Sequence, residues 1–222
     1  MQKLTETALE KSDTGTFTLM EVARWVGSSS NCQFALLKRA LKSGEVIRIH
    51  RGLYCLASKY LRRKPDPLAL AQRICGPSYI SLETALSYHG WIPEAVYAIT
   101  STSMDRSREF ETPLGHFSFT RIPQRVFYTE VTRIEKDGNG KSEPGFHAGE
   151  SFFMASPLKA LADYVYAHGL DWISASPVIE SLRVDENSMA GVKVETLDRL
   201  LANYSSQRVR RFLEGLRKEL HR

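Results

Sequence analysis

Side chains that could bind base edges and phosphates are concentrated between residues 29 and 51. Amide and arginine side chains form paired hydrogen bonds with base edges in a DNA major groove, and lysines neutralise phosphates. A second basic run, further along the chain, could meet phosphate or a minor groove. The sequence therefore predicts a DNA-binding surface that consists of Ser29, Ser30, Asn31, Gln33, Lys38, Arg39, Lys42, Arg48, His50 and Arg51.

A helix is predicted just before these side chains, because the sequence has a start signal and an end signal for it. Thr18 and Glu21 have the spacing of a capping box, in which each side chain binds the other's backbone N–H. Gly27 can supply the left-handed residue with which such helices commonly end. A short amphipathic stretch over residues 4–9 predicts one more helix before it.

The polar and basic side chains themselves fall on the next helix and on a hairpin. Phe34, Leu37 and Leu41 are spaced as the buried face of that helix, which leaves its polar side chains on the other face. Two β-prone runs, 46–49 and 53–56, flank a short basic turn and predict a hairpin. Helix, helix, turn, helix and hairpin is the order of a winged helix-turn-helix. The predicted fold class is α+β, with this head followed by a larger α/β C-terminal domain.

Charge and proline content both change near residue 65. Residues 1–64 hold twelve basic and five acidic residues, a net charge of +7, whereas residues 65–207 carry −6 and residues 208–222 carry +4. All nine prolines lie between Pro65 and Pro177. We therefore expect a DNA-binding domain over 1–64 and a C-terminal domain over 65–222, with separate activities. The basic head favours a polyanion as its partner, and the alternative is a winged helix that docks only proteins.

Motifs of the common enzyme classes are missing from the sequence. Residues 138–142 resemble the end of a P-loop, but Glu135 occupies the position of the first glycine, so a hairpin turn explains them better. No lysine follows an acidic residue at the spacing of a nuclease, and no His-Glu-x-x-His or Gly-x-Ser-x-Gly motif occurs. The histidines and cysteines lack the spacing of zinc ligands. The sequence predicts no enzyme activity, no metal and no cofactor.

Several sequence features indicate the cellular compartment of the protein. No apolar run approaches the ~18 residues of a membrane span, and the first residues lack the apolar core of a secretory signal. The three cysteines are odd in number and widely spaced, which argues against a disulfide scaffold. These features predict a cytoplasmic protein with no membrane partner.

Three segments carry a resemblance to a known family. Residues 41–54 read Leu-x-x-Gly-x-Val-x-Arg-x-x-Arg-Gly-Leu-Tyr, and residues 79–90 read Tyr-Ile-Ser-x-x-x-Ala-Leu-x-x-His-Gly. Residues 155–163 read Ala-x-Pro-x-Lys-Ala-Leu-x-Asp, with Leu158 where the family usually has glutamate. In order and spacing these segments resemble the AbiE-type (AbiEi) antitoxins, the first components of abortive-infection toxin–antitoxin pairs.

The resemblance singles out four antitoxin-domain candidates: Ser81, His89, Lys159 and Asp163. Ser81 is predicted to cap a helix that ends at His89, where a partly protonated imidazole would favour the helix dipole. Lys159 and Asp163 have the i,i+4 spacing of an ion pair on a helix surface. For all four residues, these structural roles are favoured over an active site.

The rest of the body is predicted to alternate strands and helices. Strands are expected over 96–101, 116–122 and 131–135, with Phe117, Phe119 and Ile122 as sheet core. Helices are expected over about 177–183, 195–203 and 205–220. The basic face of the last helix is either solvated or in contact with nucleic acid or the acidic body.

The resemblance implies an antitoxin of a type IV toxin–antitoxin system. Such a protein would repress its own operon by binding inverted repeats in double-stranded operator DNA, and would counter a nucleotidyltransferase-like toxin, with or without direct contact. One alternative is a plain winged-helix transcriptional regulator with a ligand-binding body, and another is a degenerate nuclease or transferase. An adjacent toxin gene would exclude the first, and a metal-dependent activity assay tests the second.

Overall fold

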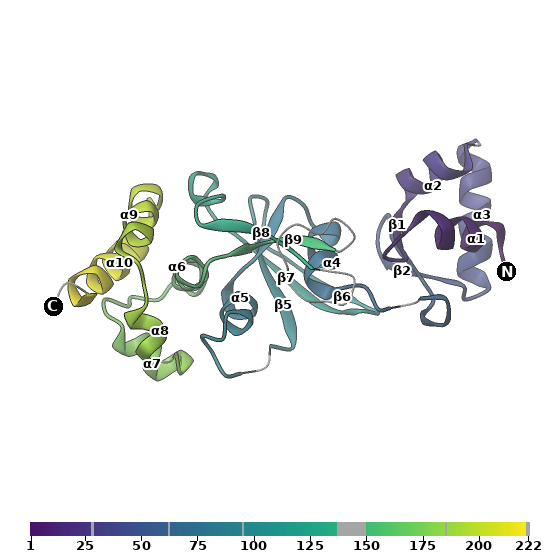
Figure 1. Cartoon of the computed structure of the whole chain (residues 1–222). Helices are drawn as coiled ribbons and strands as arrows, with labels where there is room; N and C mark the ends of the chain where they lie inside the picture. Colours follow the sequence, from purple (N-terminus) through teal and green to yellow (C-terminus); the bar gives the residue numbers. More distant parts are fainter. Residues whose placement is uncertain (28, 62, 95, 137–149, 185, 221–222) are drawn as a thin grey trace. The chain divides into compact units, whose positions relative to one another are not determined.

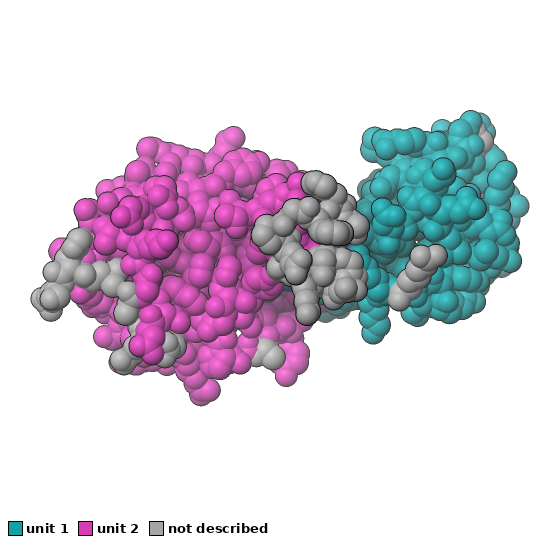
Figure 2. All heavy atoms as spheres, in the orientation of Figure 1, with its two compact units in different colours: residues 1–74, 110–115 teal, residues 75–109, 116–222 magenta. Residues whose placement is uncertain are grey.

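The structure, a computed structural model, describes residues 1–27, 29–61, 63–94, 96–136, 150–184 and 186–220. The chain forms two compact units, residues 1–74 with 110–115 and residues 75–109 with 116–222 (Figure 2). The predicted α+β class, with a small helical head before a larger α/β body, is confirmed (Figure 1). The first compact unit extends past Pro65 and includes the next helix, α4 (Pro67–Ile74).

The head has the element order of a winged helix-turn-helix. Its strands form one antiparallel sheet in the order β1-β3-β2, and β2 and β3 form the predicted hairpin. The elements are α1 (Lys3–Lys11), β1 (Thr16–Thr18), α2 (Leu19–Val26), α3 (Ser30–Lys42), β2 (Val46–His50), β3 (Leu53–Leu56) and the single 3-10 turn η1 (Ser58–Tyr60).

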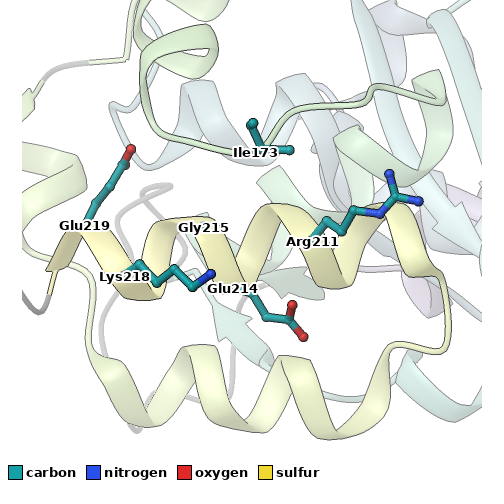
Figure 3. A pocket seen from close by; sticks show the side chains of 6 residues that line it. All are labelled: Ile173, Arg211, Glu214, Gly215, Lys218 and Glu219. Atoms are coloured by element: carbon teal, nitrogen blue, oxygen red, sulfur yellow. The ribbon is translucent and has the colours of Figure 1, made fainter.

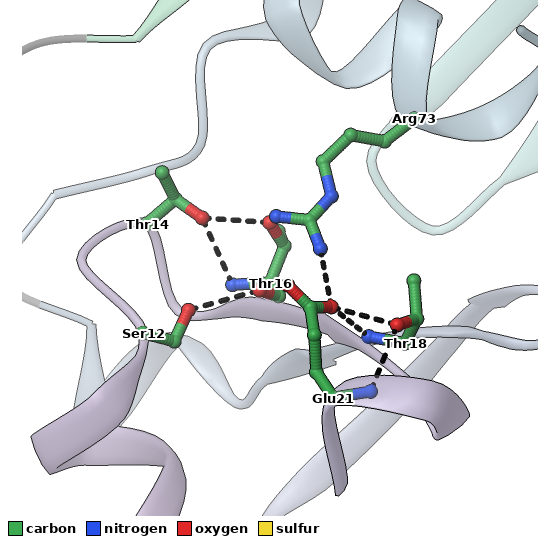
Figure 4. A network of polar contacts seen from close by, with 6 residues as sticks. All are labelled: Ser12, Thr14, Thr16, Thr18, Glu21 and Arg73. Atoms are coloured by element: carbon green, nitrogen blue, oxygen red, sulfur yellow. Dashed lines mark hydrogen bonds and ion pairs between the residues drawn. The ribbon is translucent and has the colours of Figure 1, made fainter. Parts of the chain in front are cut away.

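The capping box at the start of α2 is confirmed and is joined to α4. The Thr18 hydroxyl accepts from the Glu21 backbone N–H at 3.2 Å, and Glu21 Oε2 accepts from the Thr18 N–H at 2.6 Å. Arg73 of α4 donates to the same Glu21 oxygen at 2.8 Å (Figure 4). At the other end, Gly27 adopts the left-handed conformation that the sequence predicts. The contact between Arg73 and Glu21 is one reason why α4 groups with the head.

The buried face of α3 differs from the predicted one. Leu36, Leu37 and Ala40 are buried, whereas Phe34 keeps 54% of its surface exposed. The prediction that Phe34 lies in the core is therefore wrong. Local spacing allows either apolar stripe, and the packing of α3 on α1 and β2 selects the one that contains Leu36 and Ala40.

A six-stranded mixed sheet in the order β6-β7-β5-β4-β9-β8 forms the centre of the body. The pairs β4·β9 and β5·β7 are parallel, and β4·β5 and β8·β9 are antiparallel. The predicted strands correspond to β5, β7 and β8, and Phe117, Phe119 and Ile122 are buried as expected. The strands are β4 (Ser78–Ile80), β5 (Ala98–Ser103), β6 (Arg108–Thr112), β7 (Gly115–Arg121), β8 (Val131–Glu135) and β9 (Ser151–Ala155).

Helices cover the sheet and form the C-terminal part of the body. Helix α6 contacts strand β9 and helices α5, α9 and α10 (Figure 1). The three predicted C-terminal helices are confirmed as α7, α9 and α10, and the buried face of α10 is the predicted one. The body's helices are α5 (Leu82–Tyr88), α6 (Pro157–His168), α7 (Ser176–Leu182), α8 (Glu186–Ala190), α9 (Val194–Asn203) and α10 (Gln207–Leu220), with a 3-10 turn η2 (Gln124–Val126).

Two predictions concern absences. Among the described residues, no helix combines the length and the apolar character that a transmembrane segment requires. The P-loop-like residues 138–142 lie outside the described part of the chain, so the hairpin turn expected there stays a prediction.

Gly215 lets the loop before α7 approach helix α10 closely. A Cβ at this position would lie 1.8 Å from the Ile173 carbonyl oxygen, so no larger residue fits without a shift of the backbone. Beside this contact lies a cavity of about 380 Å³, lined by Ile173 and by the charged face of α10 (Figure 3).

We expect Gly215→Ala to lower the free energy of unfolding by about 1–3 kcal/mol, the usual cost of overpacking. At a solvent-exposed position inside a helix, the same Gly→Ala change would stabilise the protein by about 1 kcal/mol. Gly191→Ala is the matched control, since the nearest atom to its Cβ would be 3.5 Å away, and it should be close to neutral. Urea denaturation measures both variants, and a Gly215→Ala protein as stable as the wild type would contradict the close approach.

Candidate nucleic-acid interface and buried polar cluster

The predicted basic surface of the head is exposed and carries charge of one sign. Lys38, Arg39 and Lys42 on α3 and Arg48 and Arg51 on the hairpin are all exposed, and none forms an ion pair within the described residues. Neither α3 nor the hairpin contains an acidic residue between its ends. This positive charge is therefore not neutralised locally and can attract a polyanion.

Two of these cations are held against the backbone. The Arg39 Nε donates to the Ala35 carbonyl at 3.2 Å, and the Arg48 Nε donates to the His50 carbonyl at 3.4 Å. Lys38, Lys42 and Arg51 make no such bonds in the described part of the chain and extend into solvent. Flexible lysines suit phosphate contacts, which need charge more than a fixed geometry.

The polar residues at the start of α3 divide into two groups. Ser29, Ser30 and Asn31 are exposed at the helix N-terminus. Gln33 is half-buried and, by helical spacing, lies on the same side as Leu37 and Ala40, so its predicted position on the outward face is wrong. No side-chain cap bond forms at Ser29.

His50, at the end of β2, is half-buried, and its ring packs edge-on against the Phe110 ring with 4.7 Å between the ring centroids. Its imidazole therefore has a packing role in the same compact unit. By helical spacing, the structure places Asn31, Lys38 and Lys42 on one outward line of α3. Beside that line lie exposed Phe34 and Ala35, which the sequence analysis did not include in the surface.

Three of the four antitoxin-domain candidates meet in the core of the body. Asp163 Oδ2 accepts hydrogen bonds from the hydroxyls of Tyr79 and Ser81, both at 2.8 Å. Asp163 Oδ1 accepts from Lys159 Nζ at 2.5 Å and from the Tyr204 hydroxyl. Lys159 also donates to the Tyr204 hydroxyl at 3.2 Å. We call these five residues the buried polar cluster.

The predicted ion pair between Lys159 and Asp163 is confirmed, but its predicted place on the helix surface is wrong. Both side chains have 0% exposure, because α6 is covered by the sheet and by α9 and α10. The Lys159 ammonium lies 5.3 and 5.0 Å from the ring centroids of Tyr79 and Tyr204. Burial lowers the pKa of Lys159, and burial next to Asp163 raises the pKa of Tyr79 and Tyr204.

The cluster is closed to a substrate. Each carboxylate oxygen of Asp163 already accepts two hydrogen bonds, so no lone pair points at a cavity. Within the described residues no three His, Cys, Asp or Glu side chains group as metal ligands. The arrangement ties β4, α6 and the α9–α10 corner together. Tyr204 lies in the part of the chain where the family motifs give no signal, and for this reason it was missed.

Ser81 and His89 differ from their predicted roles. Ser81 precedes α5 but makes no side-chain cap bond, since its hydroxyl points to Asp163, and Leu82 next to it has a strained φ of +56°. His89 ends α5 as predicted, and its Nε2 donates to the Ala155 carbonyl at 2.9 Å. Burial lowers the pKa of His89, which disfavours the protonated imidazole, and the residue lies outside the cluster.

Two arginines of the basic face of α10 pair with acids elsewhere in the body. Arg208 contacts Asp171 and Arg217 contacts Asp198, both at 3.1 Å. The cavity beside α10 has both Arg211 and Lys218 and two glutamates on its wall (Figure 3). Of the three predicted possibilities, contact with the acidic body describes these two arginines.

Comparison with known proteins finds a similarity for the head. The model of a family described as a transcriptional regulator, AbiEi antitoxin, matches residues 6–57. This range runs from within α1 to just past β3 and contains both α3 and the hairpin. No curated protein is similar enough to the chain to count as a match.

Proposed function

We propose, from the premise that residues 6–57 match AbiEi antitoxin transcriptional regulators, that the chain is the antitoxin and autorepressor of a type IV toxin–antitoxin system. The head would bind double-stranded operator DNA at inverted repeats and repress its own operon. The body would counter a nucleotidyltransferase-like toxin in the cytoplasm, with no catalysis of its own.

The observation that carries the DNA-binding part is the group of cations on α3 and the hairpin that form no ion pair with any described residue. In winged helix-turn-helix proteins, the second helix of the motif enters the major groove. Here α3 would place Asn31 toward base edges and Lys38 and Lys42 toward phosphates. The wing residues Arg48 and Arg51 would lie against the adjacent DNA backbone. Ser29 and Ser30 would meet phosphate at the helix N-terminus.

The antitoxin part is supported by the body motifs at residues 79–90 and 155–163. In the structure these motifs form the buried polar cluster, which supports a body that acts by presenting a surface. We therefore propose that DNA binding and neutralisation divide between the head and the C-terminal domain, residues 65–222.

Binding of the full chain to the DNA that precedes its own gene tests the first part. We expect saturable binding, measured by fluorescence anisotropy, that is tighter than binding to a scrambled duplex of equal length. The logarithm of the affinity should fall with the logarithm of salt concentration by about 0.9 for each phosphate contact. Equal affinity for both duplexes would contradict operator recognition.

Co-expression tests the second part. The full chain, expressed from an independent promoter, should restore growth to cells that produce the nucleotidyltransferase-like protein of the neighbouring gene. Retained DNA binding without growth rescue would favour the plain transcriptional regulator with a ligand-binding body.

A further inference from the structure

Phe34 is an exposed aromatic side chain on the helix that carries the basic surface. It keeps 54% of its surface in solvent, while Leu36 and Leu37, two and three residues later, are almost fully buried. Because the exposed surface of this helix is otherwise mostly polar and basic, the ring offers an apolar contact to whatever partner binds that surface.

The neighbours of Phe34 on the helix surface define the chemistry of that partner. Asn31 lies one turn before Phe34 and Lys38 one turn after it, and both are exposed. Lys38 and Lys42 form no ion pair within the described residues, and α3 contains no acid. The partner therefore presents anionic groups together with a small apolar group and hydrogen-bonding groups.

Duplex DNA presents this combination in its major groove. Phosphates line the groove, base edges carry donors and acceptors, and thymine adds a C5-methyl group that apolar side chains such as phenylalanine and alanine contact. A second protein copy would bring another Lys38 and Lys42 toward the same positive surface, which is electrostatically unfavourable.

We propose that Phe34 is a specificity-determining residue that packs against the C5-methyl group of a thymine in the operator. This inference rests on the proposed DNA-binding function and adds which base α3 reads through an apolar contact. Asn31, one turn before Phe34, would hydrogen-bond a neighbouring base edge, with adenine as the natural match for an amide.

Deoxyuridine substitution tests the proposal, because deoxyuridine differs from thymidine only by the missing methyl group. A duplex is first selected from a randomised library by the full-length wild-type protein. It is then resynthesised with one thymine at a time replaced by deoxyuridine. At one or two positions the wild type should lose about fourfold in affinity, the value of one buried methyl group.

The variant Phe34→Ala should bind the selected duplex more weakly than the wild type does. Replacement of thymine by deoxyuridine at those positions should not weaken its binding further. This non-additivity is the mark of a direct contact. Leu9→Ala is the matched control, because Leu9 is an apolar residue of α1 with 40% exposure and lies outside α3. It should retain the deoxyuridine effect of the wild type.

Three results would overturn the proposal. The first is a wild-type affinity that deoxyuridine leaves unchanged at every position. The second is a deoxyuridine effect on Phe34→Ala as large as that on the wild type. In the third, Phe34→Ala changes the mass measured by analytical ultracentrifugation while it retains the wild-type response to deoxyuridine, which would assign Phe34 to a contact between copies. Failure of the wild type to select any duplex would instead refute the DNA-binding function itself, so the two failures are distinguishable.

Discussion

Replacement of Asp163 by asparagine is expected to lower the free energy of unfolding of the body by about 3–5 kcal/mol. The change leaves the Lys159 ammonium buried without a negative partner. It also replaces one of the two oxygens that accept the tyrosine hydroxyls with an NH2 group, which cannot accept. Urea denaturation followed by tryptophan fluorescence measures the loss. In a Trp25→Phe background the signal comes only from Trp91 and Trp172, which belong to the second unit.

Asp198→Asn is the matched control for this prediction. Asp198 pairs with Arg217 at the surface, where both side chains are about half exposed, and such pairs contribute about 0–1 kcal/mol. The double variant Lys159→Met/Asp163→Leu removes both charges and should recover much of the loss, because the cost comes from an unpaired buried charge. An Asp163→Asn protein as stable as Asp198→Asn would contradict the buried polar cluster.

The quadruple variant Lys38→Ala/Lys42→Ala/Arg48→Ala/Arg51→Ala should bind operator DNA with a salt dependence shallower by about 3.6 in the log–log slope. Each of these exposed cations is expected to neutralise about one phosphate, and each phosphate contributes about 0.9. Anisotropy titrations of the full chain over a range of salt concentrations measure the slope. Growth rescue against the toxin should be unchanged, since the C-terminal domain is proposed to provide it.

A second quadruple variant distinguishes the effect of this particular surface on DNA binding from the effect of the protein's net charge. Arg106, Lys193, Arg211 and Lys218 are exposed cations of the second unit that form no ion pair within the described residues. Their replacement by alanine removes the same formal charge and should leave the slope nearly unchanged. Equal slopes for the two variants would show that DNA binding depends on net charge and would refute the proposed surface.

Local features of the sequence were sufficient to predict the order of helices and strands in the head. Several features of the head depend only on neighbours within a few residues, so the local sequence is enough to predict them. They are the capping box of Thr18 and Glu21, the helix end at Gly27 and the hairpin over 46–56. The same holds for strands β5, β7 and β8 and for the amphipathic helix α10. The basic surface followed from residue types alone, because lysines and arginines of one stripe stay exposed unless acids meet them.

The tertiary structure decided which side chains are buried where local spacing allowed more than one outcome. Phe34 and Gln33 exchanged their expected positions because the packing of α3 on α1 and β2 selects the buried stripe. The i,i+4 spacing of Lys159 and Asp163 predicts their contact but says nothing of what covers α6. Tyr79, Ser81 and Tyr204 lie up to 84 residues from Asp163 along the chain, and only the packing of β4 and the α9–α10 corner on α6 brings them to its carboxylate. Local sequence therefore determined where the helices and strands of this protein lie. Long-range packing determined the burial of Lys159 and Asp163 and the exposure of Phe34, because burial depends on residues that are distant in the chain.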